Sequence, residues 1–366
     1  MTTIIKNKKK ILIFNPFGIG DVLCSTPLVR NIKEHLPDSS IFFICNRRVY
    51  PLLRNNKSID RVMVFEKDEW KEAARESRFG FFKKFFAFKS QVKEGKFDIV
   101  FDLSLKSFYG FFFKICGIKT RIGFNFKNRG KFLTHKVDLA QGFRFKHVAR
   151  YYLDLLKFLN IQPVDYKYDL PLSEPSIEVC ERILRNNKIS KDDLLIGICP
   201  ASGDSWGETA YFRRWPKENF AKLCDRLIKE LGAKIVLFGS KSEMVICDEV
   251  HNQTSTKPLN FCGRLSLDNF CAMLSLCNLV ITNDGGPFHM VQALDKRAIG
   301  FIGPVDEKVY GTYPDSGKYF VFTKTIGCRP CYKRFRFPKC EFDKRCLRQI
   351  TVDEVFLKAK ELIGSN

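Results

Sequence analysis

Short apolar runs alternate with longer segments of helical spacing along the first half of this chain. Continuous apolar runs predict strands at residues 10–15, 40–45, 61–65 and 97–103. Apolar positions that recur every three or four residues predict helices at residues 22–36, 70–88 and 147–159. Strands separated by helices are typical of a parallel sheet that is wrapped by helices.

The same alternation starts again after a stretch without any period. Residues 161–176 carry Pro163, Pro171 and Pro175, and we interpret this stretch as a linker. Beyond it the pattern predicts strands at 194–199, 234–238, 279–282 and 298–302, with helices that include 216–231 and 267–276. We therefore expect an α/β protein of two Rossmann-like, doubly wound domains facing a cleft, with ligands beyond the carboxyl ends of the strands. The expected domains are residues 1–165 and 176–350, followed by a C-terminal helix, 351–366, that packs back on the N-terminal domain.

The composition narrows the class of protein and its partners. Lys and Arg outnumber Asp and Glu by 62 to 40, a net charge of +22, which favours nucleic acid, a phosphorylated or carboxylated substrate, or the inner face of a membrane. Compositional drift toward Lys, Phe, Ile and Asn is the alternative. A hydrophobic fraction of 45% excludes a disordered chain. No apolar run reaches the roughly 18–20 residues that span a bilayer, and the run after the basic start is too short for a signal peptide, so we expect a cytoplasmic protein.

The most informative stretch is the turn at residues 283–289, Asn-Asp-Gly-Gly-Pro-Phe-His, between a predicted strand and a helical pattern. Such a turn presents backbone N–H groups and the positive end of a helix dipole, which favour an anion such as phosphate. Asp284 and His289 beside Gly285 and Gly286 suggest chemistry. The alternative is a tight connection with Asp284 as the N-cap, and these residues alone leave both open.

A second glycine turn follows the first predicted strand. Gly18, Gly20 and Asp21 lie in it, but a third glycine and a Gly-Lys-Ser/Thr element are missing, so it is neither a dinucleotide fingerprint nor a P-loop. The glycines would let a substrate approach the backbone, and Asp21 could accept a proton from an attacking hydroxyl. An N-cap role for Asp21 is the alternative.

Two more strand ends carry candidate ligands. Residues 205–216 contain Thr209, Arg213 and Arg214, and guanidinium groups pair well with diphosphate oxygens. A solvated basic loop is the alternative there. Glu243 follows another strand and glycine, where it would hold ribose hydroxyls or cap a helix.

Four cysteines stand close together near the C-terminus, at Cys328, Cys331, Cys340 and Cys346. Four thiolates could close a tetrahedral structural site for zinc or iron, although the spacing is not that of a standard zinc ribbon. The other cysteines are scattered through apolar segments and are expected to be small buried hydrophobes.

A basic and aromatic stretch at residues 79–89 reads Phe-Gly-Phe-Phe-Lys-Lys-Phe-Phe-Ala-Phe-Lys. It could rest on an anionic membrane surface. A half-buried helix with a lysine face is an equally good interpretation.

Three motifs, in the right order, resemble glycosyltransferase family 9, the bacterial heptosyltransferases. Residues 15–28 resemble its N-terminal signature, residues 213–216 its basic-Trp-Pro segment, and residues 283–289 with 303–306 its donor-site signature. The resemblance covers nearly the whole chain. It implies an inverting GT-B glycosyltransferase whose C-terminal domain binds a nucleotide sugar, usually ADP-heptose. Its N-terminal domain would bind the acceptor, an anionic glycolipid of the lipopolysaccharide inner core.

The resemblance also implies roles for single residues. Asp21 falls at the catalytic base, in an acceptor-side loop with Gly18 and Gly20. Arg213 falls at a lysine that binds the donor diphosphate, and Glu243 at an acid on the ribose or adenine side. The rest of the implied donor site is Thr209, Asp284, Gly285, Gly286 and His289.

Gly285 departs from the family pattern, because relatives carry a threonine there and its hydroxyl is missing here. No cofactor is implied for catalysis, and a structural zinc or iron at the cysteines stays an expectation. The nearest alternatives keep the fold but use a protein acceptor or another nucleotide sugar. A nucleic-acid-binding protein is disfavoured because no such module is present, and an NAD-dependent oxidoreductase because the third glycine is missing. We expect no nucleic-acid partner, and peripheral contact with the cytoplasmic face of the inner membrane.

Overall fold

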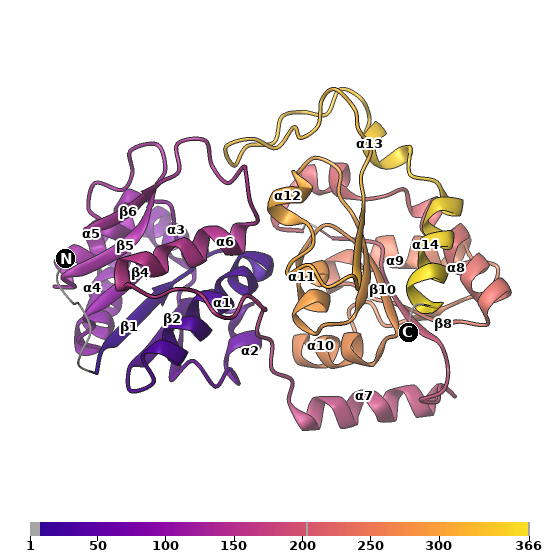
Figure 1. The fold of residues 1–366 in the computed structure, drawn as a ribbon, viewed down its shortest axis with the longest axis horizontal. Coiled ribbons are helices and arrows are strands. Elements are labelled where there is room, and N and C mark those ends of the chain that lie inside the picture. The colour runs from indigo at the N-terminus through magenta and orange to yellow at the C-terminus, as the bar shows by residue number, and fades with distance from the viewer. Residues whose placement is uncertain (1–7, 203, 365–366) are drawn as a thin grey trace. The chain divides into compact units, whose positions relative to one another are not determined.

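The computed structural model describes residues 8–202 and 204–364, and it divides into two compact units (Figure 1). The N-terminal unit holds the chain up to Phe143 together with Val148–Pro171, and the C-terminal unit holds Arg144–His147 and the chain from Leu172. The first seven residues of the basic start, Gly203 and the last two residues of the predicted C-terminal helix lie outside the described residues.

The N-terminal unit is built on a parallel six-stranded sheet in the order β3-β2-β1-β4-β5-β6. Its central strands are buried on both faces, which explains why they read as continuous apolar runs. The strands are β1 Lys10–Phe14, β2 Ser40–Cys45, β3 Arg61–Val64, β4 Ile99–Asp102, β5 Thr120–Asn125 and β6 His135–Asp138. The helices are α1 Ile19–His35, α2 Tyr50–Leu53, α3 Lys67–Glu76, α4 Arg78–Glu94, α5 Ser107–Ile115 and α6 Val148–Leu153, which continues as the 3₁₀-helix Asp154–Leu159.

The C-terminal unit repeats this plan with the order β12-β11-β10-β7-β8-β9, again all parallel. Its strands are β7 Leu195–Cys199, β8 Lys234–Leu237, β9 Leu259–Asn260, β10 Leu279–Asn283, β11 Arg297–Phe301 and β12 Tyr319–Phe322. Its helices are α7 Glu174–Asn186, α8 Lys217–Leu231, α9 Met244–Gln253, α10 Leu267–Leu276, α11 Gly286–Ala293, α12 Glu307–Tyr310, α13 Arg345–Arg348 and α14 Val352–Gly364, with 3₁₀-helices at Asp204–Arg213 and Lys241–Glu243.

Both sheets therefore have the same doubly wound topology, and the predicted α/β fold class is confirmed. The strand order reverses between β1 and β4 in one unit and between β7 and β10 in the other. Ligands of open α/β sheets bind beyond the carboxyl ends of the strands at such a switch point. The turn after β1 and the turn after β10, which the sequence singled out, each lie at one of these points.

The single helix predicted at residues 70–88 is in fact two helices, α3 and α4. Ser77 separates them with an extended backbone, and its side chain accepts a hydrogen bond from the Gly80 amide at 3.3 Å. This is an N-cap for α4. The apolar period continues through the break, so periodicity alone did not show it.

The predicted linker at residues 161–176 is only partly a connection. Its first half lies along α1, where the Arg30 guanidinium contacts Asp165 at 2.5 Å and Asn31 Oδ1 accepts from the Val164 amide at 2.7 Å. The division between the units falls between Pro171 and Leu172. Side chains of α1 thus provide hydrogen-bond partners for backbone groups of this irregular stretch.

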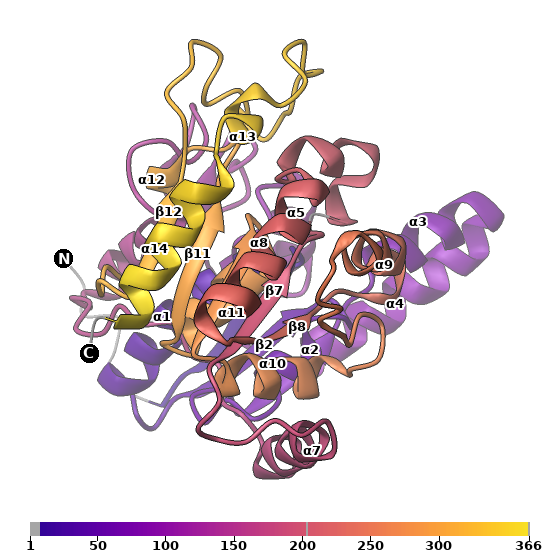
Figure 2. The same ribbon diagram turned by 90° about the vertical axis from the view of Figure 1, so that its right-hand side faces the viewer.

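The described part of the C-terminal helix packs within the C-terminal unit, whereas we expected it against the N-terminal domain. α14 lies beside α8 (Figure 2) and buries Val355, Phe356, Ala359 and Leu362 in the core of the C-terminal unit. Its apolar face is therefore already covered within its own unit. None of the described helices is long and apolar enough to cross a membrane.

Candidate active site

Asn283 fixes the geometry of the turn after β10. This side chain is fully buried; its Oδ1 accepts from the Trp215 amide at 2.8 Å, and its Nδ2 donates to the carbonyls of Pro200 and Ala201 at 2.7 and 3.1 Å. One amide thereby ties together the loop after β7, the segment before α8 and the turn itself. The sequence motif alone did not indicate this positioning role of Asn283.

Arg213 and Asp284 form a buried ion pair at this turn. The Arg213 guanidinium donates from Nη2 to Asp284 Oδ2, and the two residues are only 7% and 1% exposed. Asp284 is therefore not the N-cap of α11; Gly285 holds that position, without a side-chain cap. The first amides of α11 thus lack a side-chain acceptor at the positive end of an eight-residue helix.

The Arg213 guanidinium has a donor left over. Its Nε is buried and has no hydrogen-bond partner among the residues that the structure describes. The Trp206 ring lies over the same guanidinium, 3.9 Å from Cζ to the ring centroid. Buried donors in native proteins are nearly always satisfied, so this Nε indicates a place for a ligand oxygen.

His289 lies in the first turns of α11 and is buried. Burial lowers the pKa of His289 to about 4; the nearby Asp284 carboxylate acts against this effect, and Arg213 adds to it. The ring is therefore neutral near pH 7, and it would serve a ligand as a hydrogen-bonding group and not as a cation.

The other predicted donor residues are placed with local partners. Thr209 Oγ1 donates to the Trp206 carbonyl at 2.8 Å within the 3₁₀-helix, which is kinked at Gly207, where φ is +56°. Arg214 Nε donates to the Ser202 carbonyl at 2.9 Å, so this second guanidinium supports the loop. Glu243 closes a capping box with Ser240, accepting from its amide at 2.8 Å, which is the capping alternative from the sequence.

The loop after β1 forms the other predicted half-site. Gly18 is the N-cap of α1, so Gly20 and Asp21 lie in the first helical turn, and Asp21 is half-buried and not an N-cap. The buried Asn15 side chain shapes this loop, donating to the Asp21 carbonyl at 3.1 Å and accepting from the Phe17 amide at 3.3 Å. A Cβ at Gly18 would meet nothing within 4 Å, so the backbone there is open to approach.

Basic side chains from three further loops gather at the same edge of the N-terminal sheet. Lys67 follows β3, Lys106 follows β4, and Lys127 and Arg129 follow β5. The pKa of Lys106 is lowered by burial and by the positive charges of Arg129, Lys67 and Lys127. Because carboxyl ends of parallel strands meet at one edge, these cations collect where Asp21 stands. No local sequence pattern indicated this cluster.

Asp102 ends β4 at the switch point of the N-terminal unit. It is buried, and this burial raises its pKa to about 6, against hydrogen bonds from the Ser104 amide and hydroxyl at 3.0 and 2.5 Å. The strand predicted at residues 97–103 contains Asp102. The buried environment of its carboxyl group was not predicted.

The four clustered cysteines are neighbours in the structure without forming a ligand set. Burial raises the pKa of Cys346 to about 11; Arg329 opposes this effect, and Cys331, Cys328 and Cys340 add to it. Over residues 8–202 and 204–364, no three His, Cys, Asp or Glu side chains stand where they could hold a metal ion. The structural zinc or iron site indicated by the cysteine spacing therefore stays a prediction.

The cysteine-containing loop instead supports Trp206. The Tyr332 and Phe337 rings lie 4.8 and 5.8 Å from the Trp206 ring. The amides of Cys331 and Tyr332 both donate to the Pro304 carbonyl at 3.0 Å, which anchors the loop. A layer of aromatic rings thus backs the ring that covers Arg213.

Two doubly wound parallel units, with an anion-type turn at a switch point, are the architecture of GT-B glycosyltransferases. The family model of glycosyltransferase family 9 (heptosyltransferase) matches residues 85–340, and this chain belongs to that family.

Individual relatives agree with this. Lipooligosaccharide heptosyltransferase 2 of Campylobacter jejuni is 23% identical over 98% of this chain and 99% of its own. Lipopolysaccharide heptosyltransferase 2 of Escherichia coli is 25% identical over 81% of this chain and 83% of its own. The solved glycosyl transferase family 9 structure from Veillonella parvula superposes with a TM-score of 0.82 at 22% identity, covering 99% of both chains. The resemblance read from the motifs is confirmed, and the protein is a glycosyltransferase.

Proposed function

We propose that this enzyme transfers a heptose from ADP-heptose to a hydroxyl group of the lipopolysaccharide inner core, with inversion at the anomeric carbon. Several relatives over most of the chain are heptosyltransferases of lipopolysaccharide or lipooligosaccharide. The observation that carries the donor half is the buried Arg213–Asp284 pair, with its open Nε beside the uncapped start of α11.

In this proposal residues 176–350 bind the donor. The diphosphate lies against Arg213 and the amides at Gly285 and Gly286, where guanidinium, backbone N–H groups and helix dipole act together. Asp284 holds the guanidinium in place, and neutral His289 offers a hydrogen bond. Thr209 and Glu243 complete the proposed donor-binding set, although their present contacts are local.

Residues 1–165 bind the acceptor. Gly18 and Gly20 leave room for a sugar against the backbone, and Asp21 meets the hydroxyl that reacts. The cluster of Lys67, Lys106, Lys127 and Arg129 suits the carboxylates and phosphates of a lipopolysaccharide core. Part of the chain's excess of positive charge would then serve to bind the anionic acceptor.

The chemical step follows from these roles. The Asp21 carboxylate removes the proton of the acceptor hydroxyl while that oxygen attacks C1 of the heptose from the face opposite the diphosphate. The bond between C1 and the diphosphate oxygen breaks, and ADP leaves with its electron pair. Arg213 and the α11 amides stabilise the negative charge that grows on the leaving group. The family acts without a required cofactor, and these protein groups carry every part of the step.

We place the reaction in the cytoplasm, at the inner face of the inner membrane, because the acceptor is a membrane glycolipid. The test compares Asp21→Asn with Asp38→Asn, an exposed control in the same unit. Transfer is followed by mass spectrometry of the acceptor, and donor binding by calorimetry. We expect Asp21→Asn to bind the donor normally and to lose transfer, and the control to keep both. Full turnover by Asp21→Asn would remove Asp21 as the base.

A further inference from the structure

Helix α4 carries an exposed aromatic face that the proposed active site does not use. Phe79, Phe82 and Phe86 are 80%, 52% and 58% exposed. Phe82 and Phe86 follow Phe79 by three and seven residues, so the three rings lie on one side of the helix. Three large rings in water along one helical face are a patch and not scattered surface residues.

The opposite face of α4 already fills the core of the N-terminal unit. The Phe88 ring stacks on Phe112 of α5 at 5.0 Å and lies 5.0 Å from Phe65, and the Phe85 ring lies 5.6 Å from Phe112. Core packing therefore holds the helix in place, and it does not account for the exposed rings.

The exposed face is also basic. Lys83, Lys89 and Lys93 follow Phe79 by four, ten and fourteen residues, which places them on the same side of the helix as the three rings. None of these three lysines forms an ion pair within the described part of the chain, whereas Lys84, further round the helix, contacts Glu69 at 3.3 Å. The one acid of α4, Glu94, stands at its last residue.

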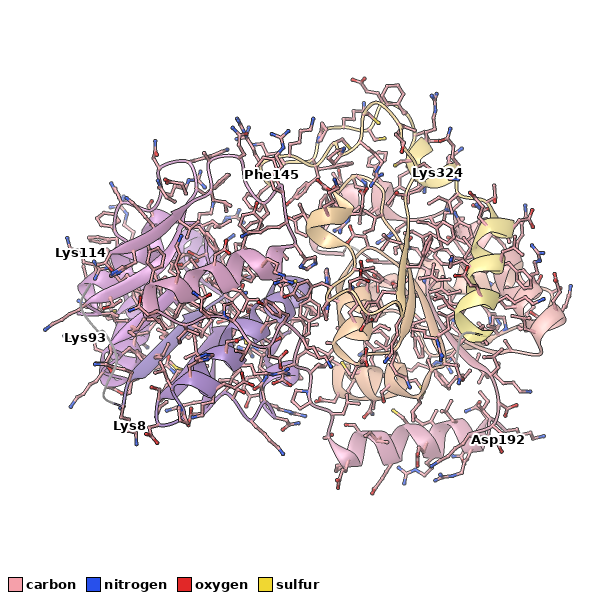
Figure 3. All side chains as sticks on the ribbon, viewed as in Figure 1. Lys8, Lys93, Lys114, Phe145, Asp192 and Lys324 are labelled. Carbon is pink, nitrogen blue, oxygen red and sulfur yellow. The ribbon has the colours of Figure 1, made fainter. Side chains whose placement is uncertain are left out.

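Helix α5, which packs beside α4 through Phe112, extends the same character. Its Phe108 and Phe111 are exposed, and Lys114 follows them. Lys93 of α4 and Lys114 of α5 lie at the same edge of the N-terminal unit in Figure 3.

We infer that this face of α4, made of Phe79, Phe82, Lys83, Phe86, Lys89 and Lys93, binds the surface of an anionic phospholipid bilayer. Aromatic rings can enter the interface while the ammonium groups beside them meet lipid phosphates. The charge decides between occupants, because a face of cations without acids complements anionic headgroups and repels a second copy of itself. This choice of partner rests on the proposed function, whose acceptor is a membrane glycolipid.

The test uses full-length protein and vesicles of phosphatidylcholine with or without phosphatidylglycerol, separated by flotation. Wild type should float with the anionic vesicles and much less with the neutral ones. A cation near a charged bilayer contributes about 1 kcal/mol, or roughly fivefold, so Lys83→Gln/Lys89→Gln/Lys93→Gln should weaken binding about a hundredfold. Phe79→Ser/Phe82→Ser/Phe86→Ser should weaken it at least as much.

The matched control is Leu357→Ser/Lys360→Gln, which changes one exposed apolar and one exposed basic residue on α14. It should bind vesicles like wild type. Circular dichroism and thermal melting of each variant should match wild type, since the altered side chains are exposed or, for Lys89, half-buried at the surface. Wild type that ignores anionic vesicles, or triple variants that bind as wild type does, would overturn the inference. So would light scattering that shows a wild-type dimer and a monomeric phenylalanine variant, because the face would then belong to a second copy.

Activity separates this inference from the proposed function. On a soluble, delipidated core acceptor, both triple variants should keep the wild-type kcat/KM. On the same acceptor embedded in vesicles, their rates should fall with their binding. If no form of the enzyme transfers heptose to either acceptor, the proposed function fails, while the flotation result still decides the membrane face.

Discussion

Replacing Arg213 by glutamine should separate the structural and the catalytic roles of the buried ion pair. The change leaves the Asp284 carboxylate, 1% exposed, without its cationic partner. Removing one member of a buried pair costs about 3–5 kcal/mol. For a unit of this size each kcal/mol lowers the melting temperature by about 2–4 °C, so we expect a fall on the order of 10 °C. Transfer should fall by about 10²–10³ in kcat, as for loss of one preorganised donor to a developing anion.

Adding Asp284→Asn to Arg213→Gln should then restore most of the lost stability without restoring transfer. The second change removes the uncompensated buried charge, but it does not return a cation to the leaving group. Thermal melting and steady-state kinetics on the four proteins of this cycle measure both effects. Arg185→Gln, at an exposed position of α7, is the control and should stay within about 1 kcal/mol of wild type. Wild-type melting and turnover by Arg213→Gln, or recovered activity in the double variant, would refute these two roles of Arg213.

Three more changes test other parts of the donor site. His289→Asn should reduce the loss of stability on acidification. Between pH 6.5 and about 4 the unfolded chain binds a proton that folded His289 does not, which costs up to about 3 kcal/mol of stability as the pH falls. Melting curves at several pH values measure the difference from wild type. An equal slope in both proteins would show that His289 titrates normally. Tyr332→Ala should raise the KM for the donor several-fold with a smaller change in kcat, because it loosens Trp206 over Arg213; an unchanged KM would deny the aromatic layer a positioning role. Asn283→Ala should cost about 2–4 kcal/mol by leaving the Trp215 amide and two carbonyls without their partner, and denaturant unfolding that shows less than 1 kcal/mol would contradict this role.

The central strands of both units could be predicted because parallel strands buried on two faces are continuous apolar runs. Residues 10–15 and 279–282 were located to within one residue as β1 and β10. The helix boundary at Ser77 was missed, since a cap changes the backbone without interrupting the apolar period. Strands β5 and β6 and helix α5 were missed as well, although the two strands complete the N-terminal sheet.

The candidate site was predictable only where it is local in sequence. The two glycine turns can be recognised from their composition. The sheet topology then explains their importance, because each turn lies at the switch point of its sheet. The contact of Arg213 with Asp284, the cover of Trp206 by Tyr332, and the gathering of Lys67 and Arg129 all join loops far apart in the chain. Such contacts depend on strand order, which no local pattern contains.

The donor and the acceptor that this enzyme uses define its proposed function most directly. In the decisive measurement, purified wild-type protein is incubated with a lipopolysaccharide core acceptor and one donor at a time: ADP-heptose, a GDP-sugar or a UDP-sugar. Mass spectrometry follows the product, and NMR determines its anomeric configuration. We predict one heptose added from ADP-heptose alone, with inverted configuration. Transfer from a different nucleotide sugar, a retained configuration, or no transfer to the core would contradict the account.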